Sequence, residues 1–480
     1  MAEHETTVRD VLRRVRDESI QFVDMKFVDV FGGLHHITFP VESVDDGMFL
    51  RGVNFDGSSI RGFQSIQESD LLLKPDPTSV FLDPFFDEPT LSLICDIVDP
   101  NGMKPYARDP RGVAQRAERA LRGLGVAETA FFGLEIEFYL FDEVRFDQAP
   151  QHGFYFLDSD AALLDTGSPR ARGRSNRGHR PGRKSAYFAA PPVDDTSNLR
   201  SKIAQTLRLV GIQPELHHHE VGAAGQNEIG FKFDRLTRTA DNAIKFKYTV
   251  KNTADRFDKT ATFMPKPLFE EAGSGMHTNV SLWKDGKNAF YRDGGYGDLS
   301  EMALHFVGGI LEHAPALCAL CAPTTSSYRR LVPGYEAPVN LVHSQRNRSA
   351  CVRIPFTGTN SAAKRLEFRT PDPSANPYLS CAAVVMAGID GVLKRTEPPD
   401  PVDENVYELA TTEHGRVLRA VPGSLEEALN ALEDDHEFLL REGVFGTGLI
   451  DTWLRTKREK EVQYISLRPH PSEFSLYFDV

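Results

Sequence analysis

The stretch FFGLEIEFYLF, residues 131–141, decides how the rest of this chain is organised. Successive side chains of an extended strand point to opposite faces, so Glu135 and Glu137 share one face. Their Cα atoms would lie roughly 7 Å apart, from two residues of strand rise. Such a pair fits either a half-solvated strand or a site for divalent cations, which favour carboxylate oxygens. The opposite face is apolar and carries Phe132, Leu134, Ile136, Phe138 and Leu140.

Three later segments repeat this pattern of an apolar face opposite a polar one. They are ELHHHEVGAAGQNEIGFKF (215–233), with a tight return at Gly225, GSGMHTNVSLW (273–283) and KRLEFRTPDPSANPYL (364–379). Four such strands predict one curved antiparallel sheet with a metal-lined concave face. The polar side chains are, in chain order, Glu220 and Glu228; His277, Asn279 and Ser281; and Arg365, Glu367 and Arg369.

The length of 480 residues exceeds what one hydrophobic core usually serves and predicts two domains, and the composition is that of a soluble protein. Turn signals at 99–102 and 109–110 place the boundary near 105, which gives domains 1–105 and 106–480. The expected fold class is α+β. The net charge of −13 argues against nucleic acid as a partner. No apolar run approaches the length expected to span a bilayer, and the charged N-terminus lacks a secretory signal, so we expect a cytoplasmic protein without a membrane partner. The five scattered cysteines are expected to be core thiols.

The first hundred residues predict a small α+β unit. A helix is expected over 8–17, followed by a hairpin over 20–40 that turns at Gly32 and Gly33. The loop FDGSSIRGFQSIQESD (55–70) either caps its own turns through Asp56 or reaches into a site. Asp109 and Pro110 predict the start of a helix that runs to about 124. A further helix is expected over 197–210, after a weakly patterned region at 142–187.

Arginines are concentrated in SSYRRLVPGYEAPVNLVHSQRNRSACVRIP, residues 326–355, and again within 168–187. Guanidinium groups bind carboxylate or phosphoryl oxygens in a bidentate way, although a structural ion-pair network or a solvated loop remains open. No GxxxxGK[ST] motif is present. A bound nucleotide would therefore need metals and arginines to hold its phosphates.

As a set, the motifs FDGSSIRGF, FGLEIEF, HHHEVGAAGQNE, GSGMHTN, RLVPGYEAPVNLV and LEFRTPDPSANPYL resemble the type I (bacterial) glutamine synthetase family. The resemblance covers essentially the whole chain. It implies a small N-terminal β-grasp domain and a large catalytic domain. It also implies ATP-dependent ligation of ammonia to the γ-carboxylate of glutamate, through a γ-glutamyl phosphate, in nitrogen assimilation and glutamine biosynthesis. The alternatives are a related γ-glutamyl amide ligase with another amine or acid, and a catalytically weak paralogue with a regulatory role.

The resemblance also implies roles for individual residues. It implies two sites for Mg²⁺ or Mn²⁺, one of Glu137, Glu220 and Glu228 and one of Glu135, His277 and Glu367. The glutamate contacts would be Glu137, Gly273, Arg330 and Arg369. The ATP contacts would be Phe233, Asn279, Ser281, Arg353 and Arg365. The catalytic residues would be Asp56, which takes a proton from ammonium, Glu336, which closes the site, and Arg348, which faces the transferred phosphate.

The same resemblance implies a homo-oligomer, expected to be a dodecamer of two hexameric rings in which Asp56 serves the neighbouring subunit. Tyr407 aligns with a tyrosine that an adenylylating enzyme modifies in many bacterial members, although the residues after it differ and an ordinary loop tyrosine remains open. Three residues depart from the family pattern near the expected substrate site. They are Ala272, Ser326 and His343.

Overall fold

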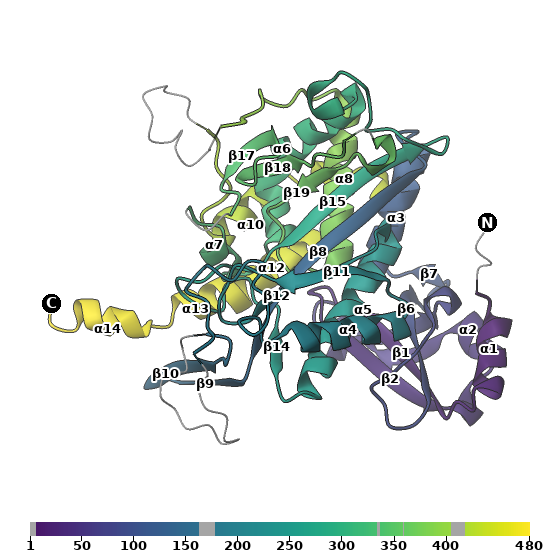
Figure 1. Cartoon of the computed structure of the whole chain (residues 1–480). Helices are drawn as coiled ribbons and strands as arrows, with labels where there is room; N and C mark the ends of the chain where they lie inside the picture. The colour runs from purple at the N-terminus through teal and green to yellow at the C-terminus, as the bar shows by residue number, and fades with distance from the viewer. Residues whose placement is uncertain (1–5, 163–177, 334–336, 359, 405–417) are drawn as a thin grey trace.

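The computed structural model describes residues 6–162, 178–333, 337–358, 360–404 and 418–480 (Figure 1). One large sheet lies in the first hundred or so residues and a second, larger one in the remainder. Helices and strands follow one another in an irregular order, which confirms the predicted α+β class.

The N-terminal sheet is mixed, with the strand order β2-β1-β6-β4-β3. The predicted hairpin is confirmed, because β1 and β2 pair antiparallel about Gly32, whose φ of +90° favours glycine. β1 and β6 run parallel, and helix α1 (Val8–Asp17) begins at a capping box formed by Thr7 and Asp10. These elements form the predicted β-grasp domain. Its strands are β1 (Phe22–Val28), β2 (Leu34–Pro40), β3 (Val53–Asp56), β4 (Asp70–Pro75), β5 (Phe81–Leu82), β6 (Thr90–Asp99) and β7 (Lys104–Pro105), with helix α2 (Asp46–Arg51) between β2 and β3.

The larger sheet has ten strands, seven of them in the order β11-β12-β8-β15-β19-β18-β17 (Figure 1). The strand quoted first, β8 (Thr129–Phe141), lies inside this sheet, and its side chains at 132, 134, 136, 138 and 140 are buried. The four strands predicted from polar and apolar alternation, β12, β8, β15 and β19, are consecutive neighbours and pair antiparallel, as expected. The other bounds are β11 (Pro214–His219), β12 (Gln226–Phe231), β13 (Asp234–Arg235), β14 (Thr260–Thr262), β15 (Met276–Lys284), β16 (Lys287–Asn288), β17 (Asn340–Gln345), β18 (Ala350–Ile354) and β19 (Leu366–Phe368).

One pair in this sheet departs from the antiparallel prediction. β17 and β18 run parallel, although only residues 346–349 separate them in sequence. Parallel neighbours ordinarily need a crossover of a dozen or more residues. The short link turns through Arg346, whose φ of +72° lies in the left-handed region.

Helices α6 and α8 form the centre of the large domain and pack against each other. Both are long and apolar enough to cross a membrane by length and composition alone, so the expectation that no such run exists is wrong. Most of each helix is buried inside the domain, which identifies both as core helices. All five cysteines are free and buried, as predicted for core thiols.

Helix α3 begins at Pro110 with Asp109 as its N-cap, as predicted, and the helix expected over 197–210 is α4. We propose that the domain boundary lies near residue 105, between β7 and α3. The large domain contains α3 (Pro110–Gly123), α4 (Ser197–Leu209), α5 (Leu236–Asp255), α6 (Glu301–Cys321), α7 (Ser327–Arg330), α8 (Pro377–Lys394), α10 (Leu425–Asp434), α11 (Glu437–Leu440), α12 (Thr447–Lys457), α13 (Gln463–Ser466) and α14 (Pro471–Tyr477).

The region 142–187 is more regular than its sequence suggested. It contains a hairpin of β9 (Glu143–Ala149) and β10 (His152–Asp158), which pairs apart from the main sheets. Most of its side chains are exposed on both faces, so no buried face imposes an apolar alternation that a sequence pattern could reveal.

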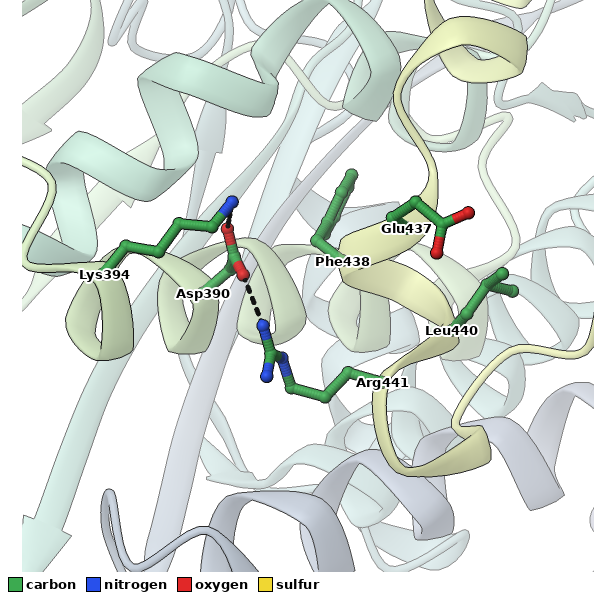
Figure 2. A pocket seen from close by; sticks show the side chains of 6 residues that line it. All are labelled: Asp390, Lys394, Glu437, Phe438, Leu440 and Arg441. Carbon is green, nitrogen blue, oxygen red and sulfur yellow. Dashed lines mark hydrogen bonds and ion pairs between the residues drawn. The ribbon is translucent and has the colours of Figure 1, made fainter.

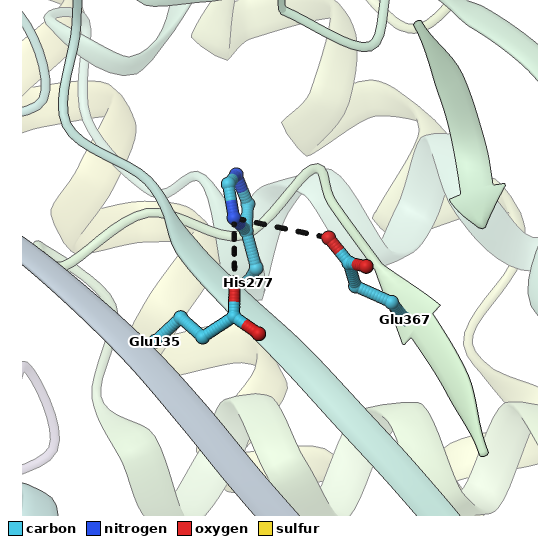
Figure 3. Close-up of side chains that lie close together, drawn as sticks. All are labelled: Glu135, His277 and Glu367. Carbon is cyan, nitrogen blue, oxygen red and sulfur yellow. Dashed lines mark hydrogen bonds and ion pairs between the residues drawn. The ribbon is translucent and has the colours of Figure 1, made fainter. Parts of the chain in front are cut away.

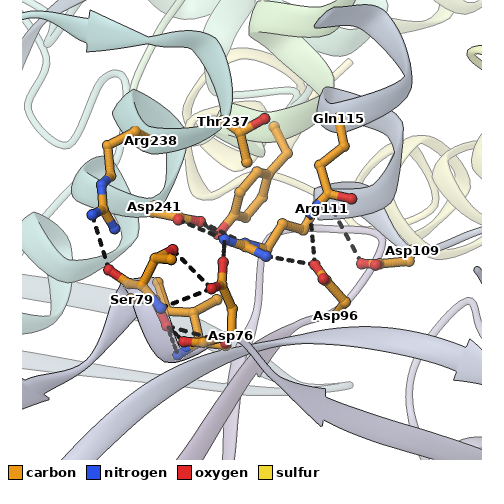
Figure 4. Close-up of polar contacts among 12 residues, drawn as sticks. Asp76, Ser79, Asp96, Asp109, Arg111, Gln115, Thr237, Arg238 and Asp241 are labelled. Carbon is orange, nitrogen blue, oxygen red and sulfur yellow. Dashed lines mark hydrogen bonds and ion pairs between the residues drawn. The ribbon is translucent and has the colours of Figure 1, made fainter. Parts of the chain in front are cut away.

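A buried arginine joins the two domains (Figure 4). Arg111 of α3 pairs with Asp76 at 2.6 Å and Asp96 at 2.5 Å from the N-terminal domain. It also pairs with Asp241 of α5 at 2.9 Å, and Asp241 accepts a hydrogen bond from Tyr378 of α8 at 2.6 Å. One guanidinium therefore compensates three carboxylates at the domain junction.

Candidate metal centre and active site

Three neighbouring strands bring Glu135, His277 and Glu367 together on one face of the larger sheet (Figure 3). Their ligand atoms all lie within 4.8 Å of one another. His277 is the direct cross-strand partner of Glu135, and its Nδ1 lies 3.4 Å from Glu135 Oε2 and 3.9 Å from Glu367 Oε1. Directly paired residues point to the same face of a sheet, which is why the register creates this cluster.

A second cluster contains His218, Glu220 and Glu228, again with ligand atoms within 4.8 Å of one another. His218 Nδ1 lies 3.4 Å from Glu220 Oε1, and His218 Nε2 lies 3.6 Å from Glu228 Oε1. The family resemblance implied Glu137 as the third ligand beside these two glutamates, and His218 was not predicted. The sequence pattern could have indicated His218, because an extended strand places residues 218 and 220 on the same face.

Glu137 lies beside this second cluster. It is the cross-strand partner of Glu228, and its Oε2 accepts hydrogen bonds from Gln226 Nε2 at 3.0 Å and from the Gly275 N–H at 2.8 Å. Burial and the charge of Glu228 raise the pKa of Glu137 to about 8. Burial and the charges of Glu137 and Glu228 raise the pKa of Glu220 to about 9. The protein alone therefore leaves these carboxylates undercompensated.

The donor chemistry of the two clusters suits divalent cations. Carboxylate oxygens with one imidazole are ligands that Mg²⁺ and Mn²⁺ accept, and a dication would favour the ionised form of each glutamate. Like charges directly opposite on paired strands, such as Glu137 and Glu228, otherwise destabilise a sheet. The solvated-strand interpretation fails for Glu137, which is buried.

Arginines surround the first cluster. Arg353 and Arg369 each form an ion pair with Glu367. Arg330, at the end of α7, is buried and donates to the backbone carbonyls of Thr370 at 2.8 Å and Arg369 at 3.0 Å. A Cβ at Gly273 would lie 2.7 Å from Arg330 Cγ, so this glycine allows the arginine side chain to pack. These contacts fit a structural ion-pair network, and they also place the arginines beside the acidic cluster, where they can bind carboxylate or phosphoryl oxygens.

A cavity of about 360 Å³ opens beside both clusters, in the size range of small-molecule sites. Glu135 and Glu228 line it on the side of the clusters, aromatic side chains from β8, β12 and β15 form part of its wall, and residues 362–365 close another side. Asn279 connects the two parts, because it donates to Glu135 at 3.0 Å and accepts from Arg365 Nε at 3.1 Å. Four of the five predicted ATP contacts line this cavity, namely Phe233, Asn279, Ser281 and Arg365. The fifth, Arg353, pairs with Glu367 instead.

The remaining predicted residues are placed differently. Asp56 is exposed in the N-terminal domain, where it accepts hydrogen bonds from Ser58 Oγ and Ser59 Oγ at 2.6 Å. These hydrogen bonds lower the pKa of Asp56, the one from Ser58 most, and so keep the carboxylate ionised. Arg348 is exposed and lies close to Tyr187, where its positive charge favours the ionised form of the tyrosine. Tyr187 was not predicted as a site residue. Glu336 and Tyr407 lie outside the described residues.

Two family profiles match the chain. "Glutamine synthetase, beta-Grasp domain" matches residues 19–100, and "Glutamine synthetase, catalytic domain" matches residues 107–477. This protein belongs to the glutamine synthetase family. A glutamine synthetase of Frankia alni is 53% identical over 475 residues, covering 99% of this chain and all of the relative. One of Mycolicibacterium smegmatis is 51% identical over 477 residues, with the same coverage.

Solved structures agree with this membership of the glutamine synthetase family. The cryo-EM structure of Plasmodium falciparum glutamine synthetase matches with a TM-score of 0.90 at 28% identity, covering 98% of this chain and 99% of that one. A GmaS–ADP complex matches with a TM-score of 0.80 at 29% identity and covers 98% of this chain. The established relatives and the catalytic-domain match make the chain a bacterial type I enzyme, a glutamate-ammonia ligase.

Two of the three residues that depart from the family pattern, Ser326 and His343, are buried. Ala272 contributes its backbone carbonyl, which accepts a hydrogen bond from the Tyr139 hydroxyl at 2.6 Å. Ser326 Oγ accepts one from the Lys266 N–H at 3.3 Å. His343 is buried, and burial lowers its pKa to about 4, so it is neutral. The family itself uses ATP and divalent metal ions.

A second hollow of about 340 Å³ lies away from the acidic clusters, beside α8 and α11 (Figure 2). Its polar centre is Asp390, which pairs with Lys394 at 2.7 Å and Arg441 at 2.9 Å. Behind it, His313 of α6 lies 3.0 Å from Asp390 and 2.8 Å from Asp435, and its ring stacks on Phe438. The internal ion pairs identify this hollow as a structural feature.

This arrangement predicts a pH-dependent contribution to stability. Burial alone would lower the pKa of His313, but bonds to Asp390 and Asp435 raise it from 6.5 to about 9. A raised folded-state pKa gives stabilisation that is complete below pH 6.5 and is lost as the pH rises through 9. His313→Gln should therefore cost up to about 3 kcal/mol at pH 6 and little at pH 9.5. Urea denaturation across this range measures it, and a pH-independent cost would contradict a charged His313.

Proposed function

We propose that this ligase binds two divalent cations, Mg²⁺ or Mn²⁺, on the acidic face of its larger sheet. Glu137, Glu220 and Glu228 would hold one, and Glu135, His277 and Glu367 the other. The observation that carries the proposal is that each glutamate cluster contributes one carboxylate, Glu135 or Glu228, to the lining of a single cavity that also has an aromatic wall. The position of His218 between Glu220 and Glu228 supports it as an additional ligand or neighbour of the first ion.

The cations would neutralise phosphate charge and polarise the phosphoryl group that ATP transfers. A carboxylate does not form an amide directly in water, so glutamate would first accept the γ-phosphoryl group as γ-glutamyl phosphate. Arg348, Arg353 and Arg365 would bind phosphoryl oxygens, and Arg330 and Arg369 with Gly273 would position glutamate. Asp56, ionised by its serine contacts, would take a proton from ammonium, and Glu336 would exclude water.

An isotope experiment tests this sequence of steps. Glutamate labelled with ¹⁸O in its γ-carboxylate should deliver one ¹⁸O atom to the released phosphate, because ammonia displaces the phosphate together with that oxygen. Mass spectrometry of the phosphate measures the transfer. Unlabelled phosphate during glutamine formation would exclude γ-glutamyl phosphate. The same assay with a panel of larger amines tests the amide-ligase alternative, which requires turnover with a bulky amine and none with ammonium.

The aromatic wall of the cavity predicts where the nucleotide base lies. Phe233 is 51% exposed and meets Phe131 edge to face at 5.6 Å. A planar base stacked on Phe233 gains about 1 to 3 kcal/mol. Phe233→Ala should therefore weaken ADP binding about 5- to 100-fold and leave the affinity for glutamate unchanged, as isothermal titration would show. Phe257→Ala is a matched control, since Phe257 is 49% exposed and does not line the cavity. If Phe233→Ala and Phe257→Ala bind ADP with equal affinity, the base does not stack on Phe233.

We further propose the dodecamer of two hexameric rings, in the cytoplasm, with Asp56 completing the site of the adjacent subunit. Exposed apolar side chains support an assembly, because monomers rarely expose such patches. Helix α14 projects from the body and exposes Phe474, Leu476, Tyr477 and Phe478 (Figure 1).

Removing residues 467–480 should therefore reduce the mass of the assembly. We expect size-exclusion chromatography with light scattering to give twelve subunits for the full chain and six or fewer for the truncated one. Phe478→Ser should have part of this effect, and the exposed control Asp479→Asn none. A fully active monomer would contradict the shared site.

Tyr407 is proposed as a site for an adenylylating enzyme. Intact-mass measurement of protein purified from its native host under nitrogen-rich growth should show an added adenylyl group. A mass without an added adenylyl group would contradict the proposed modification of Tyr407.

A further inference from the structure

The link between β17 and β18 is short and holds an unfavourable backbone conformation. Residues 346–349 connect two parallel strands, and Arg346 adopts a φ of +72°. A non-glycine residue in the left-handed region costs on the order of 1 kcal/mol, and it persists only where the surroundings hold it. The same link carries Arg348, so whatever holds the link also sets the position of this arginine.

A segment from a distant part of the sequence, residues 402–404, supplies that support. The Asp403 carboxylate accepts hydrogen bonds from Ser344 Oγ at 2.6 Å and from the Gln345 N–H at 3.1 Å. The Tyr296 hydroxyl donates to the same oxygen at 2.6 Å. Ser344 and Gln345 are the last residues of β17, immediately before the link.

Asn347, inside the link, completes the attachment. Its Nδ2 donates to the backbone carbonyl of Glu404 at 2.7 Å and more weakly to that of Val402 at 3.4 Å. Its Oδ1 accepts from the N–H of Ser349 at 3.0 Å and from the Ser349 hydroxyl at 2.7 Å. The amide therefore uses both its donor and its acceptor groups to fix the residues on either side of Arg348.

The outer edge of β17 and the residue before it form backbone hydrogen bonds with Val402, Arg419 and Val421. β17 is the last strand in the order of its sheet. The Leu341 N–H donates to the carbonyl of Arg419 at 2.8 Å, the Val421 N–H donates to the carbonyl of Val339 at 2.9 Å, and the Val402 N–H donates to that of His343 at 3.0 Å. The Val402 bond anchors the supporting segment 402–404 to β17 independently of the link.

We propose that Asp403, together with Asn347, is a positioning residue that holds the 346–349 link so that Arg348 faces the transferred phosphate. The proposal rests on the function proposed above, in which Arg348 contacts that phosphate. Arg348 lies close to Tyr187, and the Tyr187 ring meets His218 of the second glutamate cluster at 5.6 Å, which supports an orientation of Arg348 toward that cluster.

Asp403 is suited to a test that separates position from folding. It is exposed, so its removal leaves no buried charge and should not unfold the domain. Asp403→Ala should lower kcat for phosphoryl transfer about ten-fold or more while the Kd for ADP changes less than two-fold, because none of the residues lining the nucleotide cavity belongs to the link. Asp403→Asn keeps an acceptor oxygen and should restore kcat to within about three-fold of the unmodified enzyme. Asn347→Ala should reproduce the Asp403→Ala effect.

Asp293→Ala provides the matched control, because Asp293 is an exposed aspartate three positions before Tyr296 in the sequence and lies outside the 346–349 link. Hydrogen exchange of the amides at 344–349 should accelerate in Asp403→Ala and not in Asp293→Ala. A kcat for Asp403→Ala within two-fold of Asp293→Ala, or unchanged exchange at 344–349, would overturn the positioning role. Arg348→Ala is assayed first. If it turns over like the unmodified enzyme, the proposed contact of Arg348 with the phosphate fails, whereas a slow Arg348→Ala together with normal turnover in Asp403→Ala refutes only the positioning role.

Discussion

Glu367→Gln should abolish most of the metal-dependent activity, with turnover reduced at least about 100-fold. Glu367 is buried between Arg353 and Arg369 and lies 3.9 Å from His277. The substitution keeps the size of the side chain and removes its negative charge. Two guanidinium groups then face the remaining ligands without compensation, which repels a cation from the cluster of Glu135 and His277.

Titration with Mn²⁺ measures the effect directly. The unmodified protein should bind two ions per chain and Glu367→Gln one, with the remaining site at Glu220 and Glu228. Glu397→Gln is the control, because Glu397 is an exposed glutamate that pairs with His305 away from the clusters. Two sites of unchanged affinity in Glu367→Gln would show that Glu367 serves only the arginine network.

Arg111→Met should destabilise the fold by about 3 to 5 kcal/mol, the range seen when one partner of a buried ion pair is removed. Methionine fills a similar volume but leaves Asp76, Asp96 and Asp241 without their shared cation. The burial of Asp109 beside them, together with the charge of Asp96, already raises its pKa to about 7, so the junction tolerates no further negative charge. The domain junction, where one hydrophobic core continues from one domain into the other, should open more readily.

Urea denaturation followed by tryptophan fluorescence gives the change in free energy, and limited proteolysis near residue 105 reports whether the domain junction opens first. Arg119→Met is the matched control, since Arg119 lies on the same helix and is exposed. A cost below about 1 kcal/mol for Arg111→Met would mean that water replaces the guanidinium at the junction.

Much of the site could be predicted from local patterns. The alternation of Glu135 and Glu137 with buried apolar residues follows from strand geometry alone, and the structure places both glutamates as expected. His218 was missed because its neighbours, His217 and His219, hide a single outward histidine in a run of three. The hairpin at 143–158 was missed because neither of its faces is buried.

The sequence by itself determined which side chains share a face of each strand, because the two-residue period of a strand is a local property. The motifs also identified the family. Only the tertiary structure decided which faces meet. The pairing of Glu135 with His277, of Glu137 with Glu228 and of the link at 346–349 with Asp403 depends on register and packing between segments far apart in the chain. Such contacts form only when the whole sheet closes around its buried core, and no local pattern encodes them.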